Sequence, residues 1–245
     1  GTSPCKTACP AHLPVQGYVK MAAQGRYMDA LKLIKHENPF PAVCGAICNR
    51  RCEDACTRGT IDEPIAIDAV KRFIAERDLH ADTRYVPPIV VPASIHKNGW
   101  EEKIAIIGGG PAGLSCAFYL AERGYKPTVF EKNENAGGML RYGIPNYRFP
   151  RKRLAQDIDY ILKTGVEVRL NTQIGRDISM EDLEKEYDAV YISIGAQTDK
   201  NFDIEGADSL NVISAVNLLR DVGLEKRLDF SGLKVAVIGG GNVAM

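Results

Sequence analysis

The sequence predicts a small helical domain, then an α/β domain built on a parallel sheet, and then the beginning of a second α/β domain. Three observations support this prediction. The first 80 residues combine helical periodicity with six of the seven cysteines, and strand-like runs alternate with helix-like runs from about residue 100. An apolar run followed by a glycine-rich turn also occurs twice. We expect domains at residues 1–83, 101–230 and 231–245, the last incomplete, and a linker at 84–100.

The chain has 245 residues, 31 Lys and Arg against 31 Asp and Glu, and 45% hydrophobic residues, which are ordinary values for a soluble protein with a core. Its formal net charge of zero disfavours nucleic acid and anionic membranes as partners. No apolar run approaches the ~18 residues of a membrane-spanning helix, and no signal-peptide pattern is present, so we expect a cytosolic location. Because the sequence starts without a methionine and stops just after a glycine-rich turn, we expect a segment of a longer protein.

The N-terminal domain is expected to be helical. Residues 14–37 show helical periodicity with a break at Gly25, and the following Asn-Pro-Phe-Pro run should end that helix. Residues 67–79 form a second amphipathic stretch, whose apolar face is predicted to comprise Ile67, Val70, Phe73 and Ile74. Three prolines within residues 84–99 favour an extended linker.

The cysteine spacing indicates a metal site, because a cytosolic chain keeps its thiols reduced. The first pair has the Cys-x3-Cys-Pro ending of the bacterial ferredoxin run, and four more cysteines follow at a constant spacing of four. This pattern favours iron–sulfur binding, with an all-cysteine zinc site as the alternative. The candidate ligands are Cys5, Cys9, Cys44, Cys48, Cys52 and Cys56.

A dinucleotide-binding fingerprint begins the α/β domain. A buried-strand pattern at 103–107 leads into a turn in which Gly108 permits the tight bend, Gly110 lets the backbone approach a pyrophosphate, and Gly113 allows close packing. The next strand ends in Glu131, 18 residues after Gly113, where an acid is expected to bind the ribose hydroxyls. A Rossmann-like dinucleotide domain is therefore predicted, and a Rossmann-like domain without nucleotide is the alternative.

A second glycine pair, Gly137-Gly138, favours FAD over NAD at this first site, unless the pair belongs to an ordinary loop. The predicted strand at 188–196 is expected to be buried and to end in small residues that approach the flavin. The residues expected at the flavin are Gly108, Gly110, Pro111, Ala112, Gly113, Glu131, Lys132, Gly137, Gly138, Leu140, Arg141 and Gly195.

The remaining α/β pattern comprises a helix at 152–164, a half-exposed strand at 166–170 and a capping box that begins at Ser179. A strand at 234–238 and a second glycine turn are then expected to open an NAD(P)H-binding domain. Its candidate residues are Gly239, Gly241 and Asn242.

Taken together, the cysteines and both glycine turns make the sequence resemble the glutamate synthase small-subunit family. That family includes the N-terminal half of dihydropyrimidine dehydrogenase and the FAD subunit of bifurcating NADH–ferredoxin–NADP transhydrogenases. The resemblance spans nearly the whole chain. Its most specific parts are the Cys5-x3-Cys9-Pro10 motif and the runs at residues 38–45, 64–67 and 138–145.

The resemblance implies that hydride passes from NAD(P)H to FAD, and that electrons then leave singly through two 4Fe-4S clusters to a larger partner subunit or domain. No catalytic acid–base residue is expected, because this chemistry belongs to the cofactors. A zinc-stapled structural or interaction module with a non-catalytic Rossmann-like domain is the rival interpretation, and Glu131 and the Gly137-Gly138 pair speak against it.

By position in the family, Cys5 and Cys56 are implied to serve one cluster, whose other two ligands lie in an upstream Cys-x2-Cys pair that this sequence begins too late to contain. The resemblance assigns Cys9, Cys48 and Cys52 to the second cluster.

Some relatives complete that second cluster with a Gln or Glu at the position that matches Lys71. An ammonium group cannot ligate iron, so we expect Cys44 as the fourth ligand, with solvent or a backbone group as the alternative.

Overall fold

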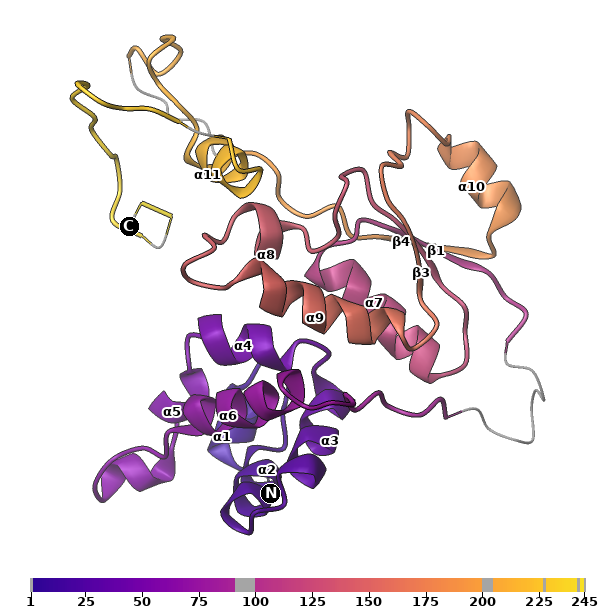
Figure 1. Ribbon diagram of the computed structural model, residues 1–245, viewed down its shortest axis with the longest axis vertical. Coiled ribbons are helices and arrows are strands. Elements are labelled where there is room, and N and C mark those ends of the chain that lie inside the picture. The colour runs from indigo at the N-terminus through magenta and orange to yellow at the C-terminus, as the bar shows by residue number, and fades with distance from the viewer. Residues whose placement is uncertain (1, 91–99, 200–204, 227, 242, 245) are drawn as a thin grey trace.

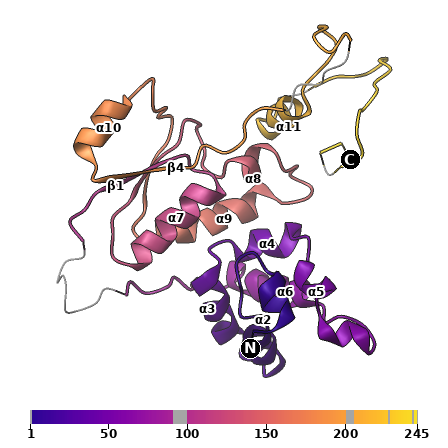
Figure 2. The ribbon, with the colours of Figure 1, turned by 180° about the vertical axis from the view of Figure 1, so that it is seen from behind.

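The computed structural model describes residues 2–90, 100–199, 205–226, 228–241 and 243–244. A helical part and an α/β part contact each other, and helix α9 of the α/β part lies against helix α4 of the helical part (Figures 1 and 2). None of the described helices is long and apolar enough to cross a bilayer.

The helical part confirms the predicted helices. The stretch at 14–37 forms two helices, and Gly25 provides the break between them at a φ of +74°. The stretch at 67–79 forms one helix with the predicted ends. The elements are α1 (Pro4–Ala8), α2 (Val15–Ala23), α3 (Tyr27–Glu37), α4 (Pro41–Ile47), α5 (Arg51–Asp54), the 3-10 turn η1 (Thr57–Thr60) and α6 (Ile67–Leu79).

Two details of the helical part differ from the prediction. Asn38 does end α3, but Pro41 then starts a new helix, α4, because proline is well suited to the first position of a helix. Phe73 was expected in the apolar face of α6, yet its side chain is 44% exposed and lies edge-on to the ring of Tyr27. That part of the prediction is wrong, since the buried face of α6 also contains charged side chains such as Lys71.

The α/β part is built on four parallel strands in the order β3-β2-β1-β4. The strands are β1 (Ile104–Ile107), β2 (Thr128–Phe130), β3 (Glu167–Arg169) and β4 (Ala189–Ile192). The helices are α7 (Pro111–Glu122), α8 (Met139–Tyr142), α9 (Arg151–Leu162), α10 (Met180–Glu186) and α11 (Ala215–Gly223). The predicted capping box is confirmed, because Ser179 Oγ accepts a hydrogen bond from the backbone N–H of Asp182 at 3.1 Å.

Both faces of the sheet are covered by helices. Ile106 packs in one cluster with Leu114 of α7, whereas the neighbouring Ala105 packs in another with Leu183 of α10. Because successive strand residues point to opposite faces, α7 and α10 lie on opposite sides of β1. This is the layered arrangement that the alternating pattern predicted.

Two strand predictions need correction. The strand predicted at 188–196 was expected to be buried, but the observed strand β4 is an edge strand that ends at Ile192, and Ile192 and the following Ile194 are about 60% exposed. Residues 234–238 form no strand, and Val237 is exposed. A strand needs a neighbour for its backbone hydrogen bonds, and none of the described segments pairs with this one.

The linker is anchored at its start. Residues 84–90 contain no helix or strand, as predicted, and the rest of the predicted segment up to residue 99 lies outside the described residues. The Arg84 guanidinium donates to Asp78 Oδ2 of α6 from Nη2 at 2.7 Å and to the backbone oxygen of Gln156 in α9. Arg84 therefore joins the two parts of the molecule.

Further buried polar groups cross the same interface. Asp157 of α9 accepts a hydrogen bond from the backbone N–H of Val43 at 3.3 Å, and the Tyr160 hydroxyl donates to the backbone oxygen of Pro39. Within the helical part, Lys35 of α3 donates at 2.9 Å to Asp78 Oδ2, the atom that Arg84 also contacts, and the side chains of Lys35 and Asp78 are essentially inaccessible to water. Removing one partner of such a pair leaves an uncompensated buried charge, so the interface has one defined arrangement.

This interface makes the stability depend on pH through Asp157. Burial raises the pKa of Asp157 to about 6, from an ordinary value of 3.8. Between these values the folded protein binds more protons than the unfolded chain, so the unfolding free energy should fall as pH rises through that window. One carboxyl contributes a slope of at most about 1.4 kcal/mol per pH unit. The slope measured by urea unfolding across the window should be more negative in the wild type than in Asp157→Asn, by up to this amount, whereas equal slopes would contradict the prediction.

Candidate functional site

Two positions at the junction of β1 and α7 accept only glycine, Gly108 for its backbone conformation and Gly113 for lack of space. Gly108 has a φ of +106°, and a Cβ there would lie 2.4 Å from the backbone oxygen of Ser193. At Gly113 a Cβ would lie 2.0 Å from the oxygen of Gly108. Gly110 differs, because a Cβ there would make only an ordinary contact, at 3.7 Å, with Gly138 Cα. A glycine at this position lets the backbone approach a pyrophosphate closely, beside the free N–H groups at the N-terminus of α7.

Ser193 at the end of β4 holds this turn in place. Its hydroxyl lies 2.9 Å from the backbone oxygen of Ile107 and 3.1 Å from that of Gly108. Sequence reasoning noticed only the small residues at the end of this strand and missed Ser193. The spacing of polar and small residues alone could not show that the hydroxyl reaches a turn 85 residues away.

The second glycine pair contacts the first turn. The backbone N–H of Gly137 donates to the oxygen of Gly109 at 2.7 Å, and a Cβ on Gly138 would lie 2.8 Å from Gly110 Cα. Both glycines of the pair have positive φ. The two glycine segments therefore form one continuous backbone surface, as expected for a shared cofactor site.

Glu131 lies directly beside this surface and is 4% exposed. Its Oε2 accepts the backbone N–H of Gly109 at 2.8 Å. Its Oε1 accepts both the backbone N–H of Asn133 at 2.9 Å and the Asn133 side-chain amide at 2.6 Å. Oε2 keeps one acceptor site, so the side chain remains able to bind a ribose hydroxyl. Glu131 and the glycine turn beside it fit a dinucleotide such as FAD.

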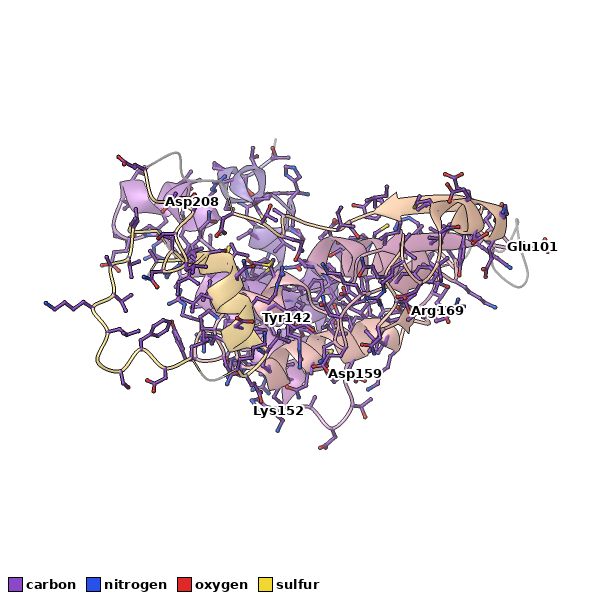
Figure 3. The ribbon with its side chains drawn as sticks, turned by 90° about the horizontal axis from the view of Figure 1, so that it is seen from above. Glu101, Tyr142, Lys152, Asp159, Arg169 and Asp208 are labelled. Carbon is purple, nitrogen blue, oxygen red and sulfur yellow. The ribbon has the colours of Figure 1, made fainter. Side chains whose placement is uncertain are left out.

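Further residues predicted at the flavin lie in the segment that follows β2 and in the segment that follows β4. Leu140 packs in the hydrophobic core, Arg141 is half-buried and Lys132 is exposed. Gly195 has a φ of +69°, as a turn after β4 requires. Figure 3 shows Tyr142, at the end of α8, beside α11, in agreement with the close approach between the Tyr142 backbone and Gly223.

The predicted NAD(P)H turn is exposed. Gly239 has a φ of +117°, and a Cβ placed on Gly239 or on Gly241 would have no atom of the described residues closer than 4.0 Å. Asn242 lies outside the described residues.

Four of the six candidate cysteine ligands lie in one region of the helical part, namely Cys5, Cys9, Cys48 and Cys52. The thiols of Cys5, Cys9 and Cys52 all act electrostatically on the buried Tyr18 hydroxyl, whose pKa is raised by burial and then by these thiols. Cys48 lies near enough to Cys52 to raise its pKa as well. The thiols of Cys5 and Cys9 converge on those of Cys48 and Cys52 although Cys48 lies 39 residues after Cys9 in the sequence.

The last two cysteines differ from the others. Cys44 lies beside Cys48, and burial raises the pKa of its thiol. Cys56 lies near the surface, where hydrogen bonds from backbone groups, led by Ile65, lower its pKa. The structure thus brings Cys44 next to Cys48, one of the ligands that the resemblance assigns to the second cluster.

The cysteine group offers thiols only, which is the ligand type of iron–sulfur clusters. Within the described ranges, no three His, Cys, Asp or Glu side chains approach closely enough to hold one metal ion. In a 4Fe-4S cluster each thiolate binds a different iron atom, so the four ligands surround a larger group.

A charged pair that sequence reasoning did not identify lies beside these thiols. Lys71 Nζ lies 2.7 Å from Asp68 Oδ1, and both side chains are almost fully buried. Although burial opposes it, the Asp68 carboxylate holds the pKa of Lys71 above its ordinary value, so the group is an ammonium. A charged residue three positions from an opposite charge on an amphipathic helix is usually exposed, and the sequence contains no signal that this pair is buried.

The sequence of the chain matches two known protein families, one for each part of the molecule. Residues 102–245 match the family described as pyridine nucleotide-disulphide oxidoreductase. The chain belongs to this oxidoreductase family. Residues 1–83 of this oxidoreductase also match dihydropyrimidine dehydrogenase domain II, 4Fe-4S cluster. The predicted iron–sulfur domain and the predicted dinucleotide-binding domain are thereby confirmed, while the assignment of individual ligands stays a prediction.

Relatives of the oxidoreductase agree with the expected resemblance. The NADP(+)-dependent formate dehydrogenase subunit beta of Moorella thermoacetica is 40% identical over 262 residues, covering 100% of this chain and 37% of the relative. The glutamate synthase (NADPH) small chain of Escherichia coli is 32% identical over 257 residues, covering 100% of this chain and 53% of the relative.

A solved structure, Mycobacterium tuberculosis FprA in complex with NADPH, aligns with a TM-score of 0.52 and 26% identity over 58% of this chain and 34% of that one. The oxidoreductase chain therefore spans about a third to a half of the length of these proteins. The resemblance to the glutamate synthase small-subunit family is confirmed, and so is the Rossmann-like fold.

Proposed function

We propose that this oxidoreductase chain binds FAD at its glycine turns and 4Fe-4S clusters at its cysteines, and that it moves electrons between NAD(P)H and a larger partner subunit. When bound, FAD would accept a hydride, which carries two electrons, and pass the electrons on one at a time. The names of the relatives support this proposal, because one is the NADP-dependent beta subunit of a formate dehydrogenase and another is the NADPH-type small chain of glutamate synthase.

One observation carries the proposal: helix α9 contacts both candidate sites. A Cβ on Gly137 would meet Leu154 of α9 at 3.1 Å, so the flavin loop rests on this helix. One turn later, Asp157 binds the backbone N–H of Val43, which directly precedes Cys44. A single helix thus holds the flavin loop and the cysteine-bearing helix α4 at a fixed separation, as electron transfer between two bound groups requires.

The chain's own groups have binding and orienting roles in this proposal. The first backbone N–H groups of α7 and the positive end of its dipole favour the pyrophosphate, and Glu131 orients the ribose. Ser193 keeps the turn rigid through its contacts with two backbone oxygens. No side chain is required to move a proton.

We further propose a cytosolic location, which is supported by cysteines that are all free thiols in the described structure. The names "subunit beta" and "small chain" of the relatives support a larger partner subunit.

The test is anaerobic visible spectroscopy of the full-length protein. Resolved flavin bands above a broad iron–sulfur absorption are expected, and NADPH should bleach both. Dithionite provides the matched control, since it reduces flavin and cluster without a nicotinamide site. A colourless protein that contains zinc would instead show a structural module and overturn the proposal.

A further inference from the structure

Lys71 and Asp68 form an ion pair that is buried rather than solvent-exposed. Its side chains are 6% and 11% exposed, and they face the interior of the helical part from the first turns of α6. Buried ion pairs add little to stability compared with apolar side chains of similar volume. A buried pair beside a cysteine group therefore suggests an electrostatic role.

Backbone packing places the pair against the cysteine helix. At Gly45 of α4, a Cβ would lie 2.8 Å from the Cα of Arg72 in α6, so the two backbones touch at this point. Cys44 and Lys71 are the chain neighbours of these two contact residues. Because Gly45 has no side chain, nothing separates the two helices there.

Two further contacts place the pair among the cysteine-bearing elements. The backbone N–H of Asp68 donates to Glu53 Oε1 at 2.8 Å, and Glu53 directly follows Cys52. Ile67 and Ile74 of α6, on either side of the pair, pack in the same hydrophobic cluster as Cys9 and Cys52. Both charges are thus close to the group of thiols, in a region where little water screens them.

We propose that Lys71 raises the reduction potential of the cluster that Cys9, Cys44, Cys48 and Cys52 would hold, and that Asp68 limits this effect as its counter-charge. The inference rests on the proposed function, since it requires a cluster at these cysteines. Reduction adds one electron from the donor to the cluster and breaks no bond, so the reduced form has one more negative charge. A nearby ammonium stabilises that form, and a nearby carboxylate destabilises it.

The test is a redox titration of the full-length protein, followed by electron paramagnetic resonance, with iron content measured in parallel. Lys71→Met should lower the midpoint potential, Asp68→Asn should raise it, and the double variant should return close to the wild-type value. Lys71→Arg keeps the charge and should keep the potential. Arg72→Gln is the matched control, because it removes an adjacent positive charge that is 52% exposed and screened by water.

The outcomes distinguish failure of the inference about Lys71 from failure of the proposed function. If Lys71→Met fails to retain iron, the direction of the shift in Asp68→Asn decides the inference. Unshifted potentials in iron-replete Lys71→Met and Asp68→Asn overturn the inference and leave the proposed function intact. A wild-type protein without any cluster signal overturns the proposed function itself.

Discussion

Replacing Cys52 by alanine should remove the iron of one 4Fe-4S cluster, about four atoms per chain, from the full-length protein. Cys52 is central to the cysteine group, because its pKa, raised to about 11 mainly by burial, also responds to the thiols of Cys48 and Cys9. Without this thiolate, one iron atom loses its protein ligand. The measurement is iron and acid-labile sulfide per chain after anaerobic purification.

Cys116→Ala is the matched control, since Cys116 of α7 packs in a different hydrophobic cluster from Cys9 and Cys52, and burial raises its pKa without any contribution from another thiol. Its iron content should equal that of the wild type. Cys44→Ala then tests the expected fourth ligand: loss of the same iron identifies Cys44, and retention points to solvent or a backbone group. Full iron in Cys52→Ala would show that the assignment carried over from the family is wrong.

Local patterns explain why much of the fold could be predicted. The 3.6-residue periodicity at 67–79 matches α6 at both ends, and the strand–glycine–helix order at 103–113 matches β1, the turn and α7. These features depend on residues close together in the chain. The prediction of a strand at 234–238 was wrong because a strand depends on residues far away in the chain. It forms only when another segment supplies its hydrogen-bond partners.

The candidate sites were predictable to different degrees. The steric need for Gly108 and Gly113 can be deduced from the motif, because the tight turn and the close packing are properties of the backbone. The interface formed by Arg84 and Asp157 could not be deduced, since these charges are buried only by contact between distant segments. The same applies to Lys71, whose sequence context is that of a solvated helix.

Replacing Gly110 by alanine should leave the fold intact and remove most of the flavin. Gly110 has a φ of −79°, which alanine adopts readily, and its Cβ would make only an ordinary contact, at 3.7 Å, with Gly138 Cα. The small gain expected from a less flexible unfolded chain and the small loss at a helix N-cap should nearly cancel. The melting temperature of the apoprotein should therefore change by only a few degrees.

The cofactor has no such tolerance, because a methyl group at Gly110 would occupy the space through which the backbone approaches the pyrophosphate. We expect flavin affinity to fall at least tenfold, which corresponds to about 1.4 kcal/mol. Gly113→Ala should differ from Gly110→Ala, because its Cβ would lie 2.0 Å from a backbone oxygen. This substitution should lower the stability of the protein as well as its flavin affinity. Flavin titration and thermal unfolding of both apoproteins separate the two effects. Full flavin content in Gly110→Ala would show that the pyrophosphate does not bind over this turn.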